Sequence, residues 1–289
     1  MSLQIALLAL TLAAPGQAAD SPLRERVMTI VANSGAEVAV AFRTLDSRTE
    51  LLLDPDKVFH AASTMKVPVM IELFRQAQAG QLSLEDPLPI RNEFHSIVDG
   101  SVYQLDVSDD SDADVYKAVG KSLSLRALCE AMITVSSNFA ANLLIERLGV
   151  ENIRQTVTRL GADGMQVLRG VEDDKAFQKG LNNTTTARGL LILMETIANG
   201  QAVDKKADAE MLSILERQHF NNAIPAGLPK GTVVAHKTGT ITKIHHDAAV
   251  VFGPRPYVLV VLVRGLADEG HSAELMASIS REVWAAASR

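Results

Sequence analysis

The hydrophobic period of this chain changes twice, and the change limits the folds that it can adopt. On the N-terminal side, Val38, Val40 and Phe42 alternate with smaller residues, and a polar turn separates them from the segment 49–53. Such alternation followed by a turn is typical of a β-hairpin. From about residue 63 to residue 217 the apolar positions recur at the helical period instead. The clearest helices of this middle part are predicted at 123–135, 140–148 and 186–198.

The strand pattern returns after Gly231. Strands are predicted at 232–242, 246–252 and 257–264. A helix at 269–287 closes the chain, and an amphipathic helix at 22–32 precedes the hairpin.

Strands at both ends of a helical middle imply a chain that leaves a sheet and returns to it. We therefore expect an α/β (α+β) fold. A discontinuous α/β domain, residues 20–62 and 216–289, would hold an antiparallel sheet flanked by the two terminal helices. An all-α domain, residues 63–215, would be inserted into it. A cleft between two such bodies is a usual place for a small-molecule site.

Composition excludes several classes of protein. The chain has 289 residues with 28 Lys and Arg against 34 Asp and Glu, and a net charge of −6 argues against a nucleic-acid-binding surface. With 47% apolar and 21% charged residues the chain has the composition of a globular protein. The single cysteine, Cys129, excludes an internal disulfide and a multi-cysteine metal site, and we expect it to be a buried core residue.

The first residues predict secretion. The apolar run 5–14 is shorter than the roughly 20 residues of a membrane-spanning helix, and small residues follow it. Residues 1–19 are therefore predicted to be a signal peptide cleaved near Ala18 or Ala19, giving a secreted or periplasmic protein without stable membrane association. Because no Lys or Arg precedes the run, a buried N-terminal helix or a misplaced start codon stays open.

Ser63 and Lys66 form a Ser-x-x-Lys pattern at the start of an apolar helix. Backbone N–H groups are unpaired there, so an oxyanion can be stabilised. Lys66 lies on the same helix face, with Cβ atoms about 5–6 Å apart. A lysine in apolar surroundings loses its proton more easily and can then activate a serine nucleophile. The alternative is a serine that only caps the helix.

Two further patterns accompany this pair. Ser136-Ser137-Asn138 lies in a break between two predicted helices, where N-capping is the alternative function. Lys237-Thr238-Gly239-Thr240 interrupts a strand pattern, and its glycine lets a ligand approach the backbone closely.

The order Ser-x-x-Lys, Ser-x-Asn, Lys-Thr-Gly resembles that of class A β-lactamases and penicillin-binding proteins. The stretches that carry the resemblance are 59–66, 132–144 and 235–240. The resemblance covers essentially the whole mature chain. It implies a β-lactamase/transpeptidase-like fold. No cofactor is expected, because acyl transfer of this kind needs only the serine, its bases and the oxyanion hole, and a monomer is the default expectation.

The resemblance also implies a role for each matching residue. Ser63 would be the acylated nucleophile, Lys66 its proton-shuttling partner, and Ser136 the donor of a proton to the leaving ring nitrogen. Asn138 would hold the substrate amide, and Lys237 and Thr238 its carboxylate. The N–H groups of Ser63 and Thr240 would form the oxyanion hole beside Gly239.

Fast deacylation in this family needs a glutamate in a long loop, and the segment 169–186 occupies the corresponding place. Glu172 is the candidate base, with a solvated acidic turn as the alternative. The family pattern Glu-x-x-Leu-Asn is not matched, because Lys175 and Ala176 stand where leucine and the water-holding asparagine would be. Asn182 and Asn183 are the candidates to replace that asparagine.

Other positions also depart from the family. Ser137 replaces the usual aspartate of the second motif. His246 falls where many members place a carboxylate-binding arginine, so a substrate contact and a hydrogen-bonded strand histidine are both open. Zinc binding by 245–247 is disfavoured, because neighbouring strand residues point to opposite faces. The acidic run 106–114 is predicted to be a solvated loop at the rim of the cleft.

Three functions are open at this point. The first is a serine β-lactamase that hydrolyses the β-lactam amide through an acyl-enzyme at Ser63. The second is a DD-peptidase-like or esterase-like serine hydrolase, or a penicillin-binding protein with slow deacylation, which the altered loop favours. The third is a non-catalytic β-lactam-binding or peptidoglycan-binding domain. The resemblance favours the first, with a small-molecule β-lactam as the partner.

Overall fold

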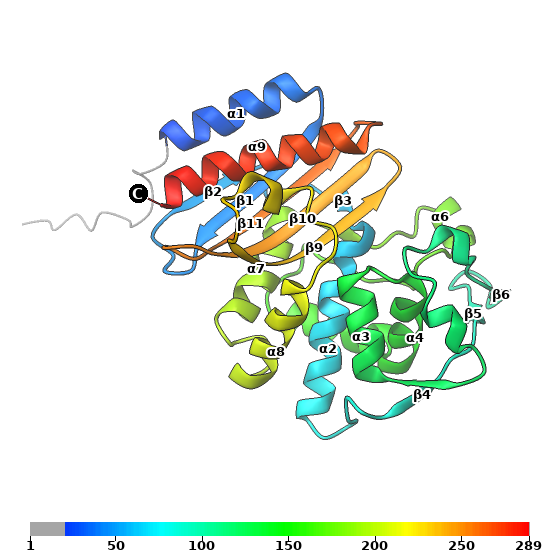
Figure 1. Ribbon diagram of the computed structural model, residues 1–289. Helices are drawn as coiled ribbons and strands as arrows, with labels where there is room; N and C mark the ends of the chain where they lie inside the picture. Colours follow the sequence, from blue (N-terminus) through cyan, green and yellow to red (C-terminus); the bar gives the residue numbers. More distant parts are fainter. Residues whose placement is uncertain (1–20, 289) are drawn as a thin grey trace, which may run out of the picture.

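The computed structural model describes residues 21–288, and Figure 1 shows them as a helix-covered sheet with a helical lobe beside it. Five antiparallel strands form the sheet in the order β2-β1-β11-β10-β9. These are β1 (Glu37–Thr44), β2 (Glu50–Leu53), β9 (Val233–Ile241), β10 (Ile244–Phe252) and β11 (Tyr257–Arg264). Because β1 pairs with β11 along its whole length, the two ends of the chain meet in one sheet.

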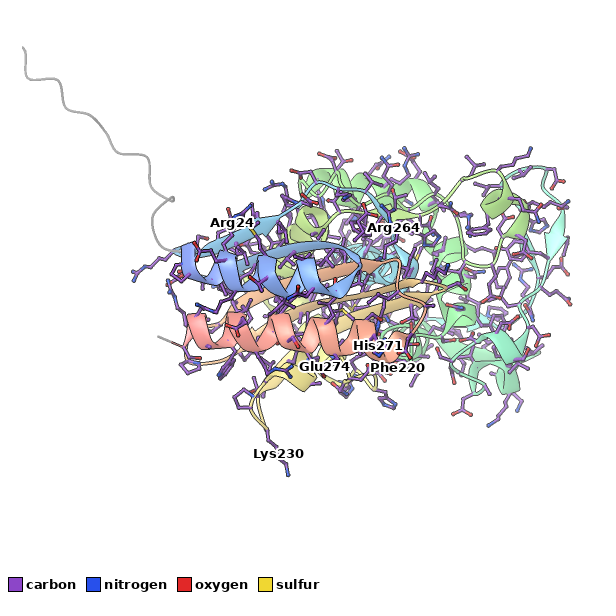
Figure 2. All side chains as sticks on the ribbon, turned by 90° about the horizontal axis from the view of Figure 1, so that it is seen from above. Arg24, Phe220, Lys230, Arg264, His271 and Glu274 are labelled. Atoms are coloured by element: carbon purple, nitrogen blue, oxygen red, sulfur yellow. The ribbon has the colours of Figure 1, made fainter. Side chains whose placement is uncertain are left out.

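The terminal helices cover one face of the sheet. They are α1 (Ser21–Ser34) and α9 (Glu269–Ala287), which lie side by side in Figure 2. An ion pair of 2.5 Å joins Arg26 to Glu282 between them. Beneath the helices lies an apolar core in which Val27, Phe42 and Ile279 are fully buried.

The opposite face of the sheet packs on helices from the middle of the chain. Seven successive residues of β11 are buried, as expected for a strand covered on both faces. Helix α7 (Ala187–Ala198) packs on β1, β10 and β11, and one apolar core joins this face to the helical lobe. The sheet therefore depends on α7 for its second apolar face.

The helical lobe surrounds the central helix α2. Its helices are α2 (Lys66–Gln78), α3 (Leu125–Thr134), α4 (Asn138–Leu148), α5 (Val150–Arg159), α6 (Asp174–Gln178) and α8 (Lys205–Glu216), with 3-10 turns η1 (Ala62–Met65), η2 (Val107–Asp109) and η3 (Val115–Ala118). A further 3-10 turn, η4 (Ile224–Gly227), packs on α9 at the other face of the sheet. In α2 even Glu72 is fully buried, and its carboxylate accepts bonds of 2.6 Å from Arg75, Gln76 and Thr156.

The predicted all-α domain at 63–215 needs correction. The middle of the chain supplies strands to three two-stranded sheets, which are β3 (Phe59–His60) with β8 (Thr184–Thr185), β4 (Pro87–Pro89) with β7 (Ser122–Ser124), and β5 (Phe94–His95) with β6 (Val102–Tyr103). In addition, α7 belongs to the sheet by its packing. The prediction missed this because helical periodicity does not show which body a helix covers.

The predicted fold class, an antiparallel sheet flanked by the terminal helices, is confirmed. The predicted bounds of β11 and α9 agree with the structure, whereas β10 begins at Ile244 rather than at residue 246. The predicted signal peptide, residues 1–19, lies outside the described residues. Within residues 21–288, no helix combines the length and apolar character that crossing a membrane requires.

Candidate active site

Ser63 lies in η1, directly before α2. The preceding Ala62 has a φ of 46°, a left-handed conformation that strains an alanine. Ser63 is half-buried, and two cavities meet at its side chain. The hydrogen bonds of residues 21–288 include none to its hydroxyl, which is therefore free to meet a substrate.

Strand β9 passes close to the backbone of η1. A Cβ atom placed on Gly239 would lie 2.9 Å from the nitrogen of Ser63 and 3.0 Å from that of Thr64. A side chain at this position would therefore push the strand away from η1. From its sequence context, Gly239 is expected to let a ligand approach the backbone closely. The structure adds a second reason for this glycine, because Gly239 also lets β9 pack closely on the backbone of η1.

Ser136 lies in a tight turn between α3 and α4, with a φ of 61°. This turn holds the amine of Lys66, which donates to the Ser136 carbonyl and to Asn138 Oδ1, both at 2.7 Å. The Nζ of Lys66 lies 3.3 Å from the Ser136 hydroxyl, and the Nζ of Lys237 lies 2.9 Å from it on the other side. One hydroxyl is thus in contact with two buried amines.

Burial changes the charge of these amines. Lys66 is fully buried, and loss of hydration lowers its pKa to about 7, although Asp110 and Glu172 act in the opposite direction. Burial and the neighbouring Lys66 hold the pKa of Lys237 well below its usual value. Near neutral pH, part of the Lys66 population is therefore unprotonated and able to accept a proton.

Glu172 joins this group through Asn138. The amide nitrogen of Asn138 donates to Glu172 Oε1 at 2.7 Å, while its amide oxygen accepts from Lys66. Burial raises the pKa of Glu172, and the nearby carboxylates of Asp110 and Asp109 add to the rise. Glu172 and Ser63 line one cavity of about 340 Å³.

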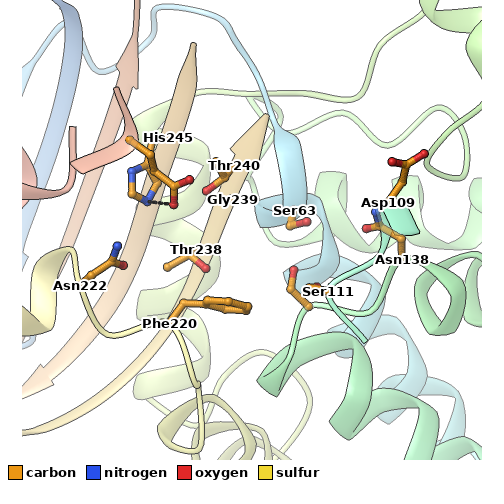
Figure 3. Close-up of a pocket in the computed structure, with 12 residues that line it drawn as sticks. Ser63, Asp109, Ser111, Asn138, Phe220, Asn222, Thr238, Gly239, Thr240 and His245 are labelled. Atoms are coloured by element: carbon orange, nitrogen blue, oxygen red, sulfur yellow. Dashed lines mark ion pairs between the residues drawn. The ribbon is translucent and has the colours of Figure 1, made fainter. Parts of the chain in front are cut away.

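A second cavity of about 260 Å³ lies on the other side of Ser63 (Figure 3). Its lining residues are Ser63, Asp109, Ser111, Ser136, Asn138, Phe220, Asn222, Thr238, Gly239, Thr240, His245 and Glu269. Most of the residues predicted from the three motifs therefore line one cavity with Ser63, and the buried Lys66 and Lys237 contact Ser136 beside it. His246 does not line this cavity. None of the groups of His, Cys, Asp and Glu side chains within residues 21–288 is arranged to hold a metal ion.

Comparison with known families decides to which family the chain belongs. A family model described as the β-lactamase enzyme family matches residues 22–287.

The chain belongs to the β-lactamase enzyme family.

Three relatives show how far the similarity extends. The β-lactamase of Bacillus licheniformis is 27% identical over 184 residues, which span 59% of this chain and 58% of that protein. The extended-spectrum β-lactamase PER-1 of Pseudomonas aeruginosa is 23% identical over 92% of this chain and 88% of that protein. The solved structure of PBP-A superposes with a TM-score of 0.81 and 27% identity, covering 95% of this chain and 98% of the other.

These findings confirm the predicted family, the β-lactamase/transpeptidase-like fold and the predicted enzyme class, a β-lactamase with a class A-like fold. The comparisons do not address individual residues, so the roles of Ser63, Lys66, Ser136 and Glu172 stay predictions.

His246 needs correction within this β-lactamase fold. Its ring is fully buried against Phe59, Nε2 donates to the carbonyl of His60 at 3.0 Å, and Nδ1 accepts from the N–H of Val263 at 3.2 Å. Burial lowers the pKa of His246 to about 4, so the ring is neutral. The prediction of a substrate contact is wrong. His245, which lies on the opposite face of β10, lines the cavity instead.

The loop that carries Glu172 is held by contacts that sequence reasoning missed. Asn142 exchanges two hydrogen bonds with the backbone of Val171, at 2.7 and 3.0 Å. Asp173 caps α6 and accepts from the Ser96 hydroxyl at 2.8 Å and from the Ile97 N–H at 3.0 Å. Asn142 falls inside the second family stretch, which was its only sequence signal.

The two asparagines proposed for holding a water are bonded within the loop, and Asn183 also lines the cavity of Glu172. The amide of Asn183 is bonded to the backbone of Leu168 and Arg169, and Asn182 accepts from the Arg169 guanidinium. Both side chains close the loop on itself. Lys175 points to Asp99 and Ser101, and Ala176 is buried. Among the described residues near Glu172, Asn138 is the side chain bonded to its carboxylate.

Replacing Gly239 by alanine tests the packing of β9 on η1. Because the added Cβ atom would collide with backbone atoms, we expect the Thr240 N–H to move away from the oxyanion position. The acylation rate should fall by about 10²–10³, the usual cost of losing one such donor. Stopped-flow acylation by benzylpenicillin measures it, and an unchanged rate would show that β9 supplies no oxyanion donor.

Proposed function

We propose that the protein hydrolyses β-lactams through an acyl-enzyme at Ser63, with Glu172 as the base that activates the hydrolytic water. The observation that carries this proposal is the hydrogen-bonded chain from Lys66 through Asn138 to Glu172. This chain supports one candidate base for each half of the reaction, Lys66 for acylation and Glu172 for deacylation, and Glu172 lines the same cavity as Ser63.

In the acylation half, neutral Lys66 takes the proton of Ser63 Oγ as this oxygen bonds to the lactam carbonyl carbon. The negative charge on the carbonyl oxygen is stabilised by the N–H groups of Ser63 and Thr240. When the ring C–N bond breaks, the Ser136 hydroxyl gives its proton to the nitrogen, and protonated Lys66 resupplies Ser136 across 3.3 Å. Lys66 thus returns to its neutral state.

In the deacylation half, the Glu172 carboxylate takes a proton from a water molecule in the cavity that it shares with Ser63. The water oxygen bonds to the ester carbonyl carbon, and the bond to Ser63 Oγ breaks. The proton held by Glu172 then returns to Ser63, which frees the enzyme. We expect the substrate carboxylate to bind at Thr238, which lines the second cavity, and at the Lys237 amine beside Ser136.

The two bases predict a separate pH dependence for each half of the reaction, and we call the rising part of each rate profile its pH limb. Glu172 acts as a carboxylate and its pKa is raised, so hydrolysis of the acyl-enzyme should decline on acidification at a pH above 4.5, the usual value. Lys66 acts as an amine, so acylation should increase as the pH rises through about 7. Single-turnover rates measured across the pH range separate the limbs. A deacylation limb at or below pH 4.5 would contradict the role of Glu172.

A penicillin-binding protein with slow deacylation is the second candidate. Ala176 leaves the position of the water-holding asparagine without a polar side chain, and PBP-A is among the structural relatives. Counting ring openings per enzyme by ultraviolet absorbance, with benzylpenicillin in excess, decides between the two. Many openings per enzyme support the β-lactamase, whereas a single opening supports the slow enzyme.

The cellular setting is also a proposal. The apolar run and small residues of the first nineteen positions support export with cleavage near Ala18 or Ala19. The exported protein would act as a monomer without membrane association. Intact mass of protein recovered from the periplasm tests this, and a retained N-terminus would contradict cleavage.

A further inference from the structure

The acidic loop 106–114 is largely exposed at the rim of the cavity, as predicted from sequence, and it also contacts the catalytic turn. The Asp110 carboxylate accepts the N–H of Asn138 at 3.0 Å and the N–H of Phe139 at 2.8 Å. These are the first N–H groups of α4, which have no partner inside the helix. A carboxylate at this end is also favoured by the helix dipole.

The position of Asp110 is fixed from other sides as well. The Tyr116 hydroxyl donates to Asp110 Oδ2 at 3.2 Å, and the Ser137 hydroxyl lies 3.5 Å from the same oxygen. The next residue, Ser111, donates to the carbonyl of Val135 at 2.7 Å. The loop therefore holds the turn around Ser136 from both of its ends.

Resting on the proposed function, we infer that Asp110 is a positioning residue for both proton-transfer steps. From a separate loop, its carboxylate accepts the first N–H groups of α4. It thereby provides a negative charge next to position 137, where the family usually has an aspartate. It fixes the backbone of Asn138, whose amide contacts Lys66 and Glu172 at 2.7 Å each. Displacement of Asn138 would disturb both bases at once.

The charge of Asp110 gives this arrangement a measurable signature. Its negative charge raises the pKa of Glu172 and opposes the fall in the pKa of Lys66. The other charged group close to Glu172 from this loop is Asp109. Removing the Asp110 charge should therefore lower both pKa values and move the pH dependence of acylation and of deacylation toward lower pH.

The test uses Asp110→Asn in the full-length protein, with acylation and deacylation followed by intact mass after mixing with benzylpenicillin. We expect both rate constants to fall by about 100-fold, the cost of a displacement of about 1 Å in a catalytic group. Both pH limbs should move down. Asp114→Asn is the matched control, because Asp114 is exposed, pairs with Lys117, and should leave both rates unchanged.

A second substitution tests whether a carboxylate at position 137 can replace that of Asp110. Ser137→Asp should lower the rates in the wild type, because two carboxylates would face each other across about 3.5 Å. In the Asp110→Asn background, Ser137→Asp should raise both rate constants at least ten-fold, since one capping carboxylate is regained. If Ser137→Asp did not raise the rates of the Asp110→Asn variant, the inference would be overturned.

A milder variant covers the case in which Asp110→Asn does not fold. Tyr116→Phe removes only the hydroxyl bonded to Asp110 and keeps the ring that packs on Phe139 at 4.5 Å. We expect a smaller fall in both rates. Unchanged rates and pH limbs in the folded variants would overturn the positioning role. If the wild type acylates without turnover, Glu172 fails as a base, whereas the acylation rates still test Asp110.

Discussion

Ser63→Ala is expected to form no covalent adduct with benzylpenicillin and to lose turnover by a factor on the order of 10⁶. The loss is this large because both halves of the proposed reaction pass through Ser63 Oγ. The remaining groups, including the two buried lysines, would then have no nucleophile to activate. Ring opening followed by ultraviolet absorbance gives the rate, and intact mass gives the adduct.

The fold should tolerate this change. Within residues 21–288 the Ser63 hydroxyl has no hydrogen-bond partner to lose, so the melting temperature should be unchanged. Ser278→Ala, at a half-buried serine on α9 far along the chain from the site, is the matched control and should keep the full rate. Persistent turnover by a folded Ser63→Ala variant would show that another group attacks the lactam.

Glu172→Gln is expected to separate the two halves of the reaction. Acylation should continue, because Lys66 and the oxyanion donors are intact, whereas hydrolysis of the acyl-enzyme should fall by about 10²–10⁴ without its general base. The adduct should therefore accumulate to one per enzyme. Single-turnover mass spectrometry reports both rates in one experiment.

The glutamine preserves the contact that positions residue 172. Its side-chain oxygen can still accept from the Asn138 amide, which lies 2.7 Å from Glu172 in the wild type. Glu151→Gln, at the exposed start of α5, controls for loss of one negative charge. Steady-state hydrolysis at the wild-type rate in Glu172→Gln would mean that another group activates the water.

The sequence predicted the strands better than it predicted the two bodies of the fold. β11 could be predicted because its apolar residues form a continuous run, and α9 because its apolar residues recur at helical spacing. It does not report which surface an apolar helix covers. That is why α7 was expected in a separate all-α domain, although it packs on the sheet.

In the site too, local patterns could be predicted from sequence, whereas contacts between distant segments could not. Ser63, Lys66, Ser136 and Lys237 could be found because each lies at a fixed spacing inside a short motif. His246 was misjudged because one residue of shift on a strand exchanges the cleft for the core. Asp110 could not be found, since its contact with α4 joins residues 28 positions apart and leaves no local pattern.

The most direct test of the account is time-resolved intact mass of the protein mixed with excess benzylpenicillin, with ring openings counted in parallel. We predict an adduct of one benzylpenicillin that maps to the peptide containing Ser63, appears transiently, and decays while many rings are opened per enzyme. A stoichiometric adduct that persists after one ring opening would contradict the β-lactamase, and the absence of any adduct would contradict acylation of Ser63 altogether.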